Sequence, residues 1–159
     1  MKFSAAILTI SDRAALGIYE DKSGKVLIDL LEDMDFEVNK YEVIADDYRS
    51  IREKLIEYSD NEISLIITSG GTGFSKKDLT AEATLSVIEK PTPGINELMR
   101  YEGAKITPLA YLSSSVSGIR KDSLIINFPG SPKACKENFK IIRPILTHAL
   151  NIIAGETNH

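Results

Sequence analysis

Cysteine and histidine are scarce in this 159-residue chain. The one cysteine, Cys135, excludes an intramolecular disulfide and a multi-cysteine metal site, and two histidines argue against a histidine-based metal site. No apolar run approaches the roughly 20 residues that span a bilayer, and the N-terminal segment lacks the apolar core of a signal peptide. These absences predict a cytoplasmic protein that is not bound to a membrane.

Positive charge is also in short supply. The chain has 19 lysine and arginine residues against 23 aspartate and glutamate residues, and its net charge is −4. Because a general nucleic-acid binder usually carries an excess of basic residues, nucleic acid is not expected as a partner. Hydrophobic residues make up 43% of the chain, which suits a compact fold, so we expect residues 1–159 to form a single domain.

Strand-like and helix-like segments alternate along the chain. Short apolar runs predict strands at residues 5–10, 63–68 and 123–127, and alternating apolar and polar residues predict one at residues 36–44. Apolar residues at steps of three and four predict helices at residues 23–34, 80–88 and 94–102, one that Asp46-Asp47 can cap, and a last one kinked or interrupted at Pro144. This alternation predicts an α/β fold, namely a three-layer α/β/α domain with a mainly parallel sheet.

The run "TSGGTGFSKKD" directly follows one of the predicted strands, and three glycines give it unusual backbone freedom. Glycines at Gly70, Gly71 and Gly73 allow positive φ angles and let backbone N–H groups approach an anion closely. The spacing matches neither a P-loop nor a dinucleotide fingerprint. These residues alone therefore predict an anion site, most readily for phosphate, and leave open a structural turn in which Asp78 caps the next helix.

Five ordered blocks of the sequence resemble the molybdopterin adenylyltransferase family of molybdenum-cofactor biosynthesis, the MogA/MoaB family. These blocks are "ISDRAALGIYEDKSG", "TSGGTGFSKKDLTAEAT", "TPG", "TPLAYLS" and "SGIRKDSLIINFPGSPKA". The resemblance covers nearly the whole chain. It implies a MogA/MoaB-like fold and a reaction that moves AMP from ATP to the terminal phosphate of molybdopterin, with release of pyrophosphate.

The resemblance also implies roles for individual residues. Asp46 and Asp78 match the carboxylates that hold Mg²⁺, although Asp46 has a competing role as a helix cap, and Ser113 matches a serine that handles molybdopterin. The residues expected to bind the nucleotide or substrate phosphates are Ser69, Gly70, Gly71, Thr72, Gly73, Lys77, Arg120, Gly130 and Ser131. Lys77 stands where many relatives have arginine, so a bidentate contact to phosphate is not expected there.

Two other functions stay open at this point. The same domain also serves within larger scaffold proteins, so the main alternative is a binding or assembly module that holds molybdopterin without transferring AMP. A nucleotide-pyrophosphate hydrolase ranks third, because such chains normally carry a further domain. The resemblance implies molybdopterin and ATP as the small-molecule partners, Mg²⁺ as the cofactor, and a homo-oligomer, most often a trimer.

Overall fold

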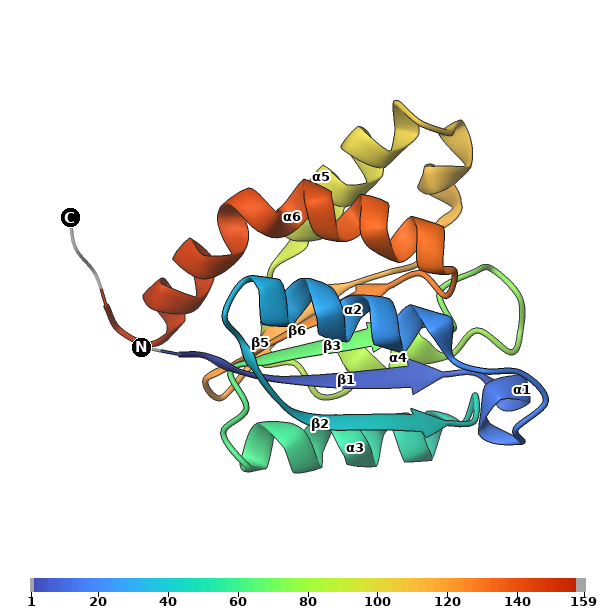
Figure 1. Ribbon diagram of the computed structural model, residues 1–159, viewed down its shortest axis with the longest axis horizontal. Helices are drawn as coiled ribbons and strands as arrows, with labels where there is room; N and C mark the ends of the chain where they lie inside the picture. The colour runs from blue at the N-terminus through green and yellow to red at the C-terminus, as the bar shows by residue number, and fades with distance from the viewer. Residues whose placement is uncertain (1, 157–159) are drawn as a thin grey trace.

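The protein is built around one central sheet, described for residues 2–156 by a computed structural model; residues 1 and 157–159 of the expected domain lie outside this range. Within it, six strands follow the order β2-β1-β3-β6-β5-β4 (Figure 1). Their bounds are β1 Ser4–Ile10, β2 Glu37–Ile44, β3 Leu65–Ser69, β4 Lys90–Pro91, β5 Ser117–Arg120 and β6 Ser123–Phe128. β2, β1, β3 and β6 run parallel, whereas β5 is antiparallel to both of its neighbours, β6 and β4.

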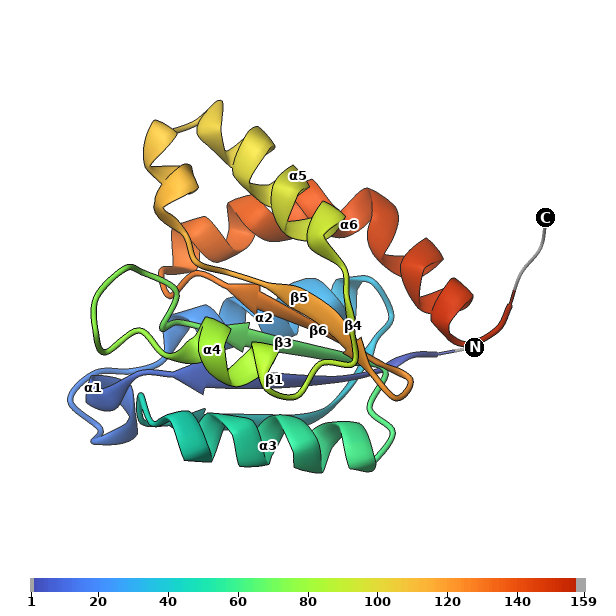
Figure 2. The same cartoon turned by 180° about the vertical axis from the view of Figure 1, so that it is seen from behind.

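Helices cover both faces of the sheet. The helices are α1 Asp12–Ala15, α2 Lys22–Asp33, α3 Tyr48–Asp60, α4 Thr80–Leu85, α5 Pro93–Ala104 and α6 Pro132–Ile153, with a 3-10 helix, η1, at Pro108–Leu112. α2, α5 and α6 lie over one face, and α3 and α4 lie over the other (Figures 1 and 2). The predicted three-layer α/β/α fold with a mainly parallel sheet is therefore confirmed.

The middle strands are apolar because both of their faces are covered. Every residue of β3 and β6 is buried, and side chains of successive residues enter opposite layers of the core. Leu65 and Ile67 pack with α2 and α6, whereas Ile66 packs with α3 and α4. Strands buried on both faces read as continuous apolar runs, which is why the sequence locates them well.

The parallel strands bring three loops to one edge of the sheet, which we call the carboxyl edge. These loops follow β1, β3 and β6, and they include the glycine loop, residues 70–78. They touch one another: the N–H of Gly70 donates to the carbonyl oxygen of Phe128 at 3.0 Å. The loops containing Gly71 and Gly130 share this edge, since both residues line one groove there.

Several details differ from the sequence-based expectations. α4 ends at Leu85 rather than at residue 88, because the chain turns to join the sheet and the Glu89 N–H donates to the Ile119 carbonyl at 2.8 Å. α6 continues through Pro144 without interruption, although it is bent in Figure 1. Asp47, not Asp46, caps α3.

Within residues 2–156, every helix is too short or too polar to cross a membrane.

Candidate functional site

The carboxyl edge contains an open groove of about 730 Å³, which we call the edge groove. It lies where the loops after β1, β3 and β6 meet. Among the residues that line it are Asp21, Asp46, Ser69, Gly70, Gly71, Asp78, Gly130 and Ser131. Ligands of open α/β sheets bind at this position, beyond the carboxyl ends of the strands. Seven of the residues that the sequence assigned to the site are thus brought together.

A second cavity, of about 280 Å³, lies on the other side of the glycine loop. We call it the lobe cavity, because α5 and η1 form its outer wall. Its lining includes Thr72, Gly73, Asn96, Arg100, Ser113 and Ser115. The glycine loop therefore contributes Gly70 and Gly71 to the edge groove and the next two residues to the lobe cavity. Ligands bound in the two cavities would therefore adjoin each other at this loop.

The backbone at Gly70 and Gly71 excludes any larger residue. Their φ angles are +105° and +67°, a region that side chains other than hydrogen rarely allow. A Cβ atom on Gly70 would lie 2.2 Å from the carbonyl oxygen of Ile10, and one on Gly71 would lie 2.2 Å from Oγ1 of Thr80. The Thr80 hydroxyl donates to the Gly70 carbonyl at 2.8 Å and fixes the loop. This close packing holds the loop open toward the groove.

Backbone contacts, rather than cations, hold the two carboxylates of the edge groove. The N–H of Asp12 donates to Oδ2 of Asp46 at 3.1 Å, and the N–H of Asp46 donates to Oδ1 of Asp12 at 2.9 Å. The N–H of Ser75 donates to Oδ2 of Asp78 at 3.0 Å. Glycines make room for both carboxylates, since a Cβ on Gly71 would lie 3.3 Å from Oδ1 of Asp46 and one on Gly73 would lie 2.8 Å from Oδ2 of Asp78.

Burial raises the pKa of Asp46 above its ordinary value, and the nearby charges of Asp12 and Asp78 raise it further. The backbone N–H of Asp12 and the charge of Lys77 act in the opposite direction. A carboxylate crowded by other carboxylates and partly removed from water gains from a bound cation. Two aspartates suit Mg²⁺, which takes oxygen ligands, is held by one or two carboxylates and keeps several waters.

The loop after β6 adds the start of the longest helix. The Ser131 hydroxyl caps α6 by accepting from the N–H of Ala134 at 3.1 Å. The Ser23 hydroxyl donates to the carbonyl of Gly130 at 2.6 Å and ties the start of α2 to this loop. Ser69 donates to the Pro129 carbonyl at 2.9 Å. Two helix N-termini thus face the groove, and both favour an anion.

Residues 113–115 are three serines, which we call the serine segment, and Ser113 and Ser115 line the lobe cavity. Ser113 donates to the hydroxyl of Ser115 at 2.9 Å, and Ser114 bonds to the carbonyl of Thr72. Ser113 is therefore separated from the edge groove by the glycine loop. Lys77 is exposed on that loop and close enough to Asp46 to lower its pKa.

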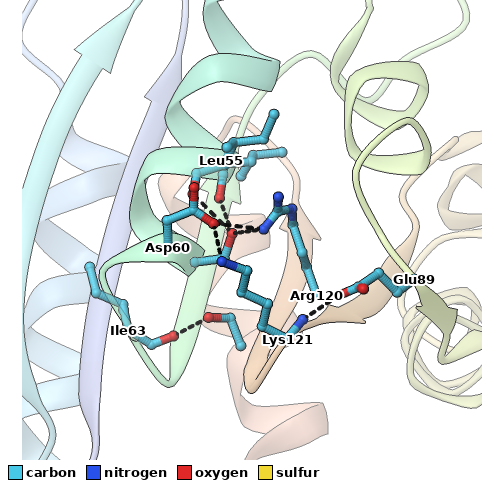
Figure 3. Close-up of polar contacts among 9 residues, drawn as sticks. Leu55, Asp60, Ile63, Glu89, Arg120 and Lys121 are labelled. Atoms are coloured by element: carbon cyan, nitrogen blue, oxygen red, sulfur yellow. Dashed lines mark hydrogen bonds and ion pairs between the residues drawn. The ribbon is translucent and has the colours of Figure 1, made fainter.

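Arg120 does not belong to this site, and its predicted role is corrected. β5 runs antiparallel to β6, so Arg120 pairs with Ser123 at the amino edge, opposite the glycine loop. There Nη1 of Arg120 lies 3.0 Å from Oδ1 of Asp60, and Nζ of Lys121 lies 2.7 Å from the same oxygen (Figure 3). The Lys121 N–H also donates to Glu89. These contacts fasten the β5–β6 hairpin to the end of α3.

Three further residues support the site but are not among the site residues predicted from the sequence. Asp21 is buried and accepts hydrogen bonds from Thr9 at 2.7 Å and Tyr41 at 2.6 Å, in addition to capping α2. Asn127 is buried in β6 and donates to two threonine hydroxyls, one on β3 and one on α4, at 2.9 Å each. An asparagine inside an apolar strand was a usable signal. Arg100, in the lobe cavity, gave none.

Comparisons with known proteins agree with this arrangement. Residues 6–148 match the family described as "Probable molybdopterin binding domain". The molybdopterin adenylyltransferase of Helicobacter pylori strain J99 is 40% identical, over 94% of this chain and 86% of that protein. The enzyme of the same name from Escherichia coli K12 is 38% identical, over 86% of this chain and 72% of its own length.

A solved structure gives the same result for the fold. The molybdopterin biosynthesis enzyme MoaB from Thermus thermophilus superimposes with a TM-score of 0.91 at 40% sequence identity. The match covers 96% of this chain and 97% of that one. Fold, family match and sequence identity thus agree over most of the chain. This protein belongs to the molybdopterin adenylyltransferase family, the MogA/MoaB family of molybdenum-cofactor biosynthesis.

Proposed function

We propose that this chain is a molybdopterin adenylyltransferase that uses ATP and Mg²⁺. An oxygen of the terminal phosphate of molybdopterin attacks the α-phosphorus of ATP, a new P–O–P bond forms, and the bond to pyrophosphate breaks. The observation that carries the proposal is the pair of cavities that share the glycine loop, with Asp46 and Asp78 on the groove side. A transferase of this kind needs two adjoining sites and a way to offset charge between them.

The chain contributes binding and alignment to this reaction. The edge groove takes the nucleotide, because backbone N–H groups of the glycine loop and the helix start at Ser131 suit phosphates. The lobe cavity takes the pterin end, with Ser113 as a donor. Holding two anions in line for displacement is the main task, since phosphoryl-type transfer depends largely on positioning and electrostatic stabilisation.

Asp46 and Asp78 are the residues that would hold Mg²⁺. Their oxygens are of the type that Mg²⁺ prefers, and the backbone contacts described above leave each carboxylate with unused lone pairs. When bound, the ion supplies positive charge that offsets the phosphates of ATP. Lys77 adds a flexible cation on the exposed side of the loop.

Transfer of label from ATP tests the proposal directly. The protein is incubated with molybdopterin, Mg²⁺ and ATP that carries its label on either the α- or the γ-phosphate. We expect the pterin to acquire label only from α-labelled ATP, with pyrophosphate formed in equal amount and no transfer when Mg²⁺ is chelated. Molybdopterin binding without Mg²⁺-dependent ATP binding would instead identify a binding or assembly module, and pyrophosphate release without pterin would identify a hydrolase.

The oligomeric state stays a prediction. A homo-oligomer, with a trimer as the expected form, follows from the family resemblance alone. Analytical ultracentrifugation of the purified chain would test it, and a monomer at all concentrations would contradict it.

A further inference from the structure

Arg100, on α5, uses its guanidinium group to hold backbone rather than a carboxylate. Its Nε donates to the carbonyl of Ser113 at 3.1 Å, and its Nη2 donates to the carbonyl of Ser115. Among residues 2–156, no acidic side chain forms an ion pair with it. One planar group therefore binds both ends of the serine segment.

The serine segment in turn holds the glycine loop. The N–H of Ser114 donates to the carbonyl of Thr72 at 2.8 Å, and the Ser114 hydroxyl lies 2.9 Å from the same oxygen. That hydroxyl also lies 3.3 Å from the carbonyl of Gly73. Three polar contacts thus join the segment to the part of the loop that separates the two cavities. Figure 2 shows the chain leaving η1 and descending beside this loop.

A close contact between Gly73 and Asp78 connects the glycine loop to the edge groove. Gly73 packs against Asp78 so closely that a Cβ atom would lie 2.8 Å from Oδ2 of that carboxylate. A shift of the Gly73 backbone therefore changes the space available to Asp78. The contacts form a continuous path from Arg100, which lines only the lobe cavity, to a carboxylate that lines only the edge groove.

A guanidinium suits this task better than an ammonium. Its donors lie in one plane at fixed angles, so that two carbonyls can be bound at once, whereas lysine presents a single flexible point charge. We propose that Arg100 is a positioning residue, which holds the serine segment against the glycine loop and so fixes the lobe cavity relative to Asp78. The catalytic consequence rests on the proposed adenylyl transfer; the structural one does not.

Amide hydrogen exchange tests the structural part without any substrate. In the Arg100→Met variant we expect the amide of Ser114 to exchange about tenfold faster, because the carbonyls on either side of it lose their donors. Arg120→Met is the matched control, since it removes a partly buried arginine from the opposite edge. The proposal fails if Ser114 exchanges at the wild-type rate in Arg100→Met, or equally fast in both variants.

Steady-state kinetics test the catalytic part. At saturating ATP and molybdopterin we expect Arg100→Met to lower kcat about 10- to 100-fold, as misplacement by about 1 Å can do. The Kd for molybdopterin should rise as well, because Ser113 belongs to the segment that Arg100 holds. Arg100→Lys should behave in the same way, because lysine keeps the positive charge but lacks the planar set of donors that binds two carbonyls. Arg120→Met should retain wild-type kcat.

The opposite pattern would overturn the proposal. If Arg100→Lys restores kcat, or if Arg100→Met raises only the Kd for molybdopterin, Arg100 acts as a charge on the substrate. Wild-type protein that transfers no AMP would refute the proposed function, and the exchange of Ser114 would still decide whether Arg100 positions the loop.

Discussion

The two edges of the sheet both carry charged clusters, but they treat their carboxylates differently. At the amino edge, Asp60 accepts from both Arg120 and Lys121 (Figure 3). At the carboxyl edge, Asp46 and Asp78 are held by backbone N–H groups, and within residues 2–156 neither makes an ion pair. The first arrangement satisfies its own charge, whereas the second leaves charge to be satisfied from outside.

This difference separates groups that stabilise the fold from groups that await a ligand. Backbone N–H donors orient a carboxylate without neutralising it, so that its remaining lone pairs face the groove. The raised pKa of Asp46 agrees with this, because burial and neighbouring carboxylates disfavour its charged form. Asp60 shows the opposite shift: the hydrogen bond from Lys121, and then that from Arg120, lowers its pKa.

The same substitution at the two edges should give the largest contrast. Asp78→Asn keeps the shape and an acceptor for the Ser75 N–H but removes the charge. We expect AMP transfer to fall about 100-fold or more, the scale of losing one group that stabilises transition-state charge. Asp60→Asn should leave transfer unchanged. Equal turnover of Asp78→Asn and wild type at saturating Mg²⁺ would rule out the metal role.

Substitutions at two glycines test whether the backbone of the glycine loop is as important to the site as the carboxylates. Gly71→Ala forces a side chain into a positive-φ position and against Thr80, so we expect a loss of about 1–3 kcal/mol in the free energy of unfolding and weaker ATP binding. Gly94→Ala is the control, because a Cβ atom there has no neighbour within 4 Å. Denaturant unfolding and calorimetric titration with ATP measure both effects; unaltered ATP affinity in Gly71→Ala would contradict the assignment of the edge groove.

Ser113→Ala tests whether the two cavities take different ligands. Loss of one hydrogen bond to a charged phosphate costs about 1.5–3 kcal/mol, so molybdopterin should bind roughly 10- to 100-fold more weakly. ATP binding should be unchanged, because the glycine loop separates Ser113 from the edge groove. Titration of the variant with each ligand checks this, and weaker ATP binding with intact pterin binding would reverse the assignment.

The smallest effect is expected from Asp60→Asn on stability. Because the folded-state pKa of Asp60 is lowered, its contribution is present above the unfolded-state pKa and disappears as pH falls through the folded-state value. We expect the variant to melt slightly below wild type at neutral pH, because a surface ion pair contributes little, and together with wild type in acid. High salt should also reduce the difference. Melting curves that differ equally at all pH values would argue against an electrostatic origin.

Much of the fold and part of the candidate site could be predicted from the sequence. The buried strands appear as apolar runs. Gly70 and Gly71 directly follow one of them and Asp78 ends the same loop, so the parallel topology places them at the carboxyl edge. The resemblance to the family added Asp46 and Ser113. Local pattern and strand direction decide these positions, and both are encoded within a few residues.

Residues that depend on long-range pairing were beyond such reasoning. Arg120 was misassigned because the sequence does not reveal that β5 runs antiparallel, which carries its end to the amino edge. Asp12 and Asp46 exchange hydrogen bonds between their backbone N–H groups and side chains although they lie 34 residues apart, so their positions in the sequence do not reveal this contact. Arg100 escaped notice because its partners are backbone carbonyls, which leave no trace in residue type.

The order of the strands also decides when the sheet can close while the chain is being synthesised. β2, β1 and β3 come from residues 4–69, but β6, the other neighbour of β3, spans Ser123–Phe128. Until β6 leaves the ribosome, the side of β3 that will pair with β6 has no neighbouring strand, and its residues are all buried in the finished fold. Open apolar edges pair readily with other chains. A translational pause before residue 123 should therefore promote aggregation of the nascent chain, whereas a pause once β6 has emerged should not.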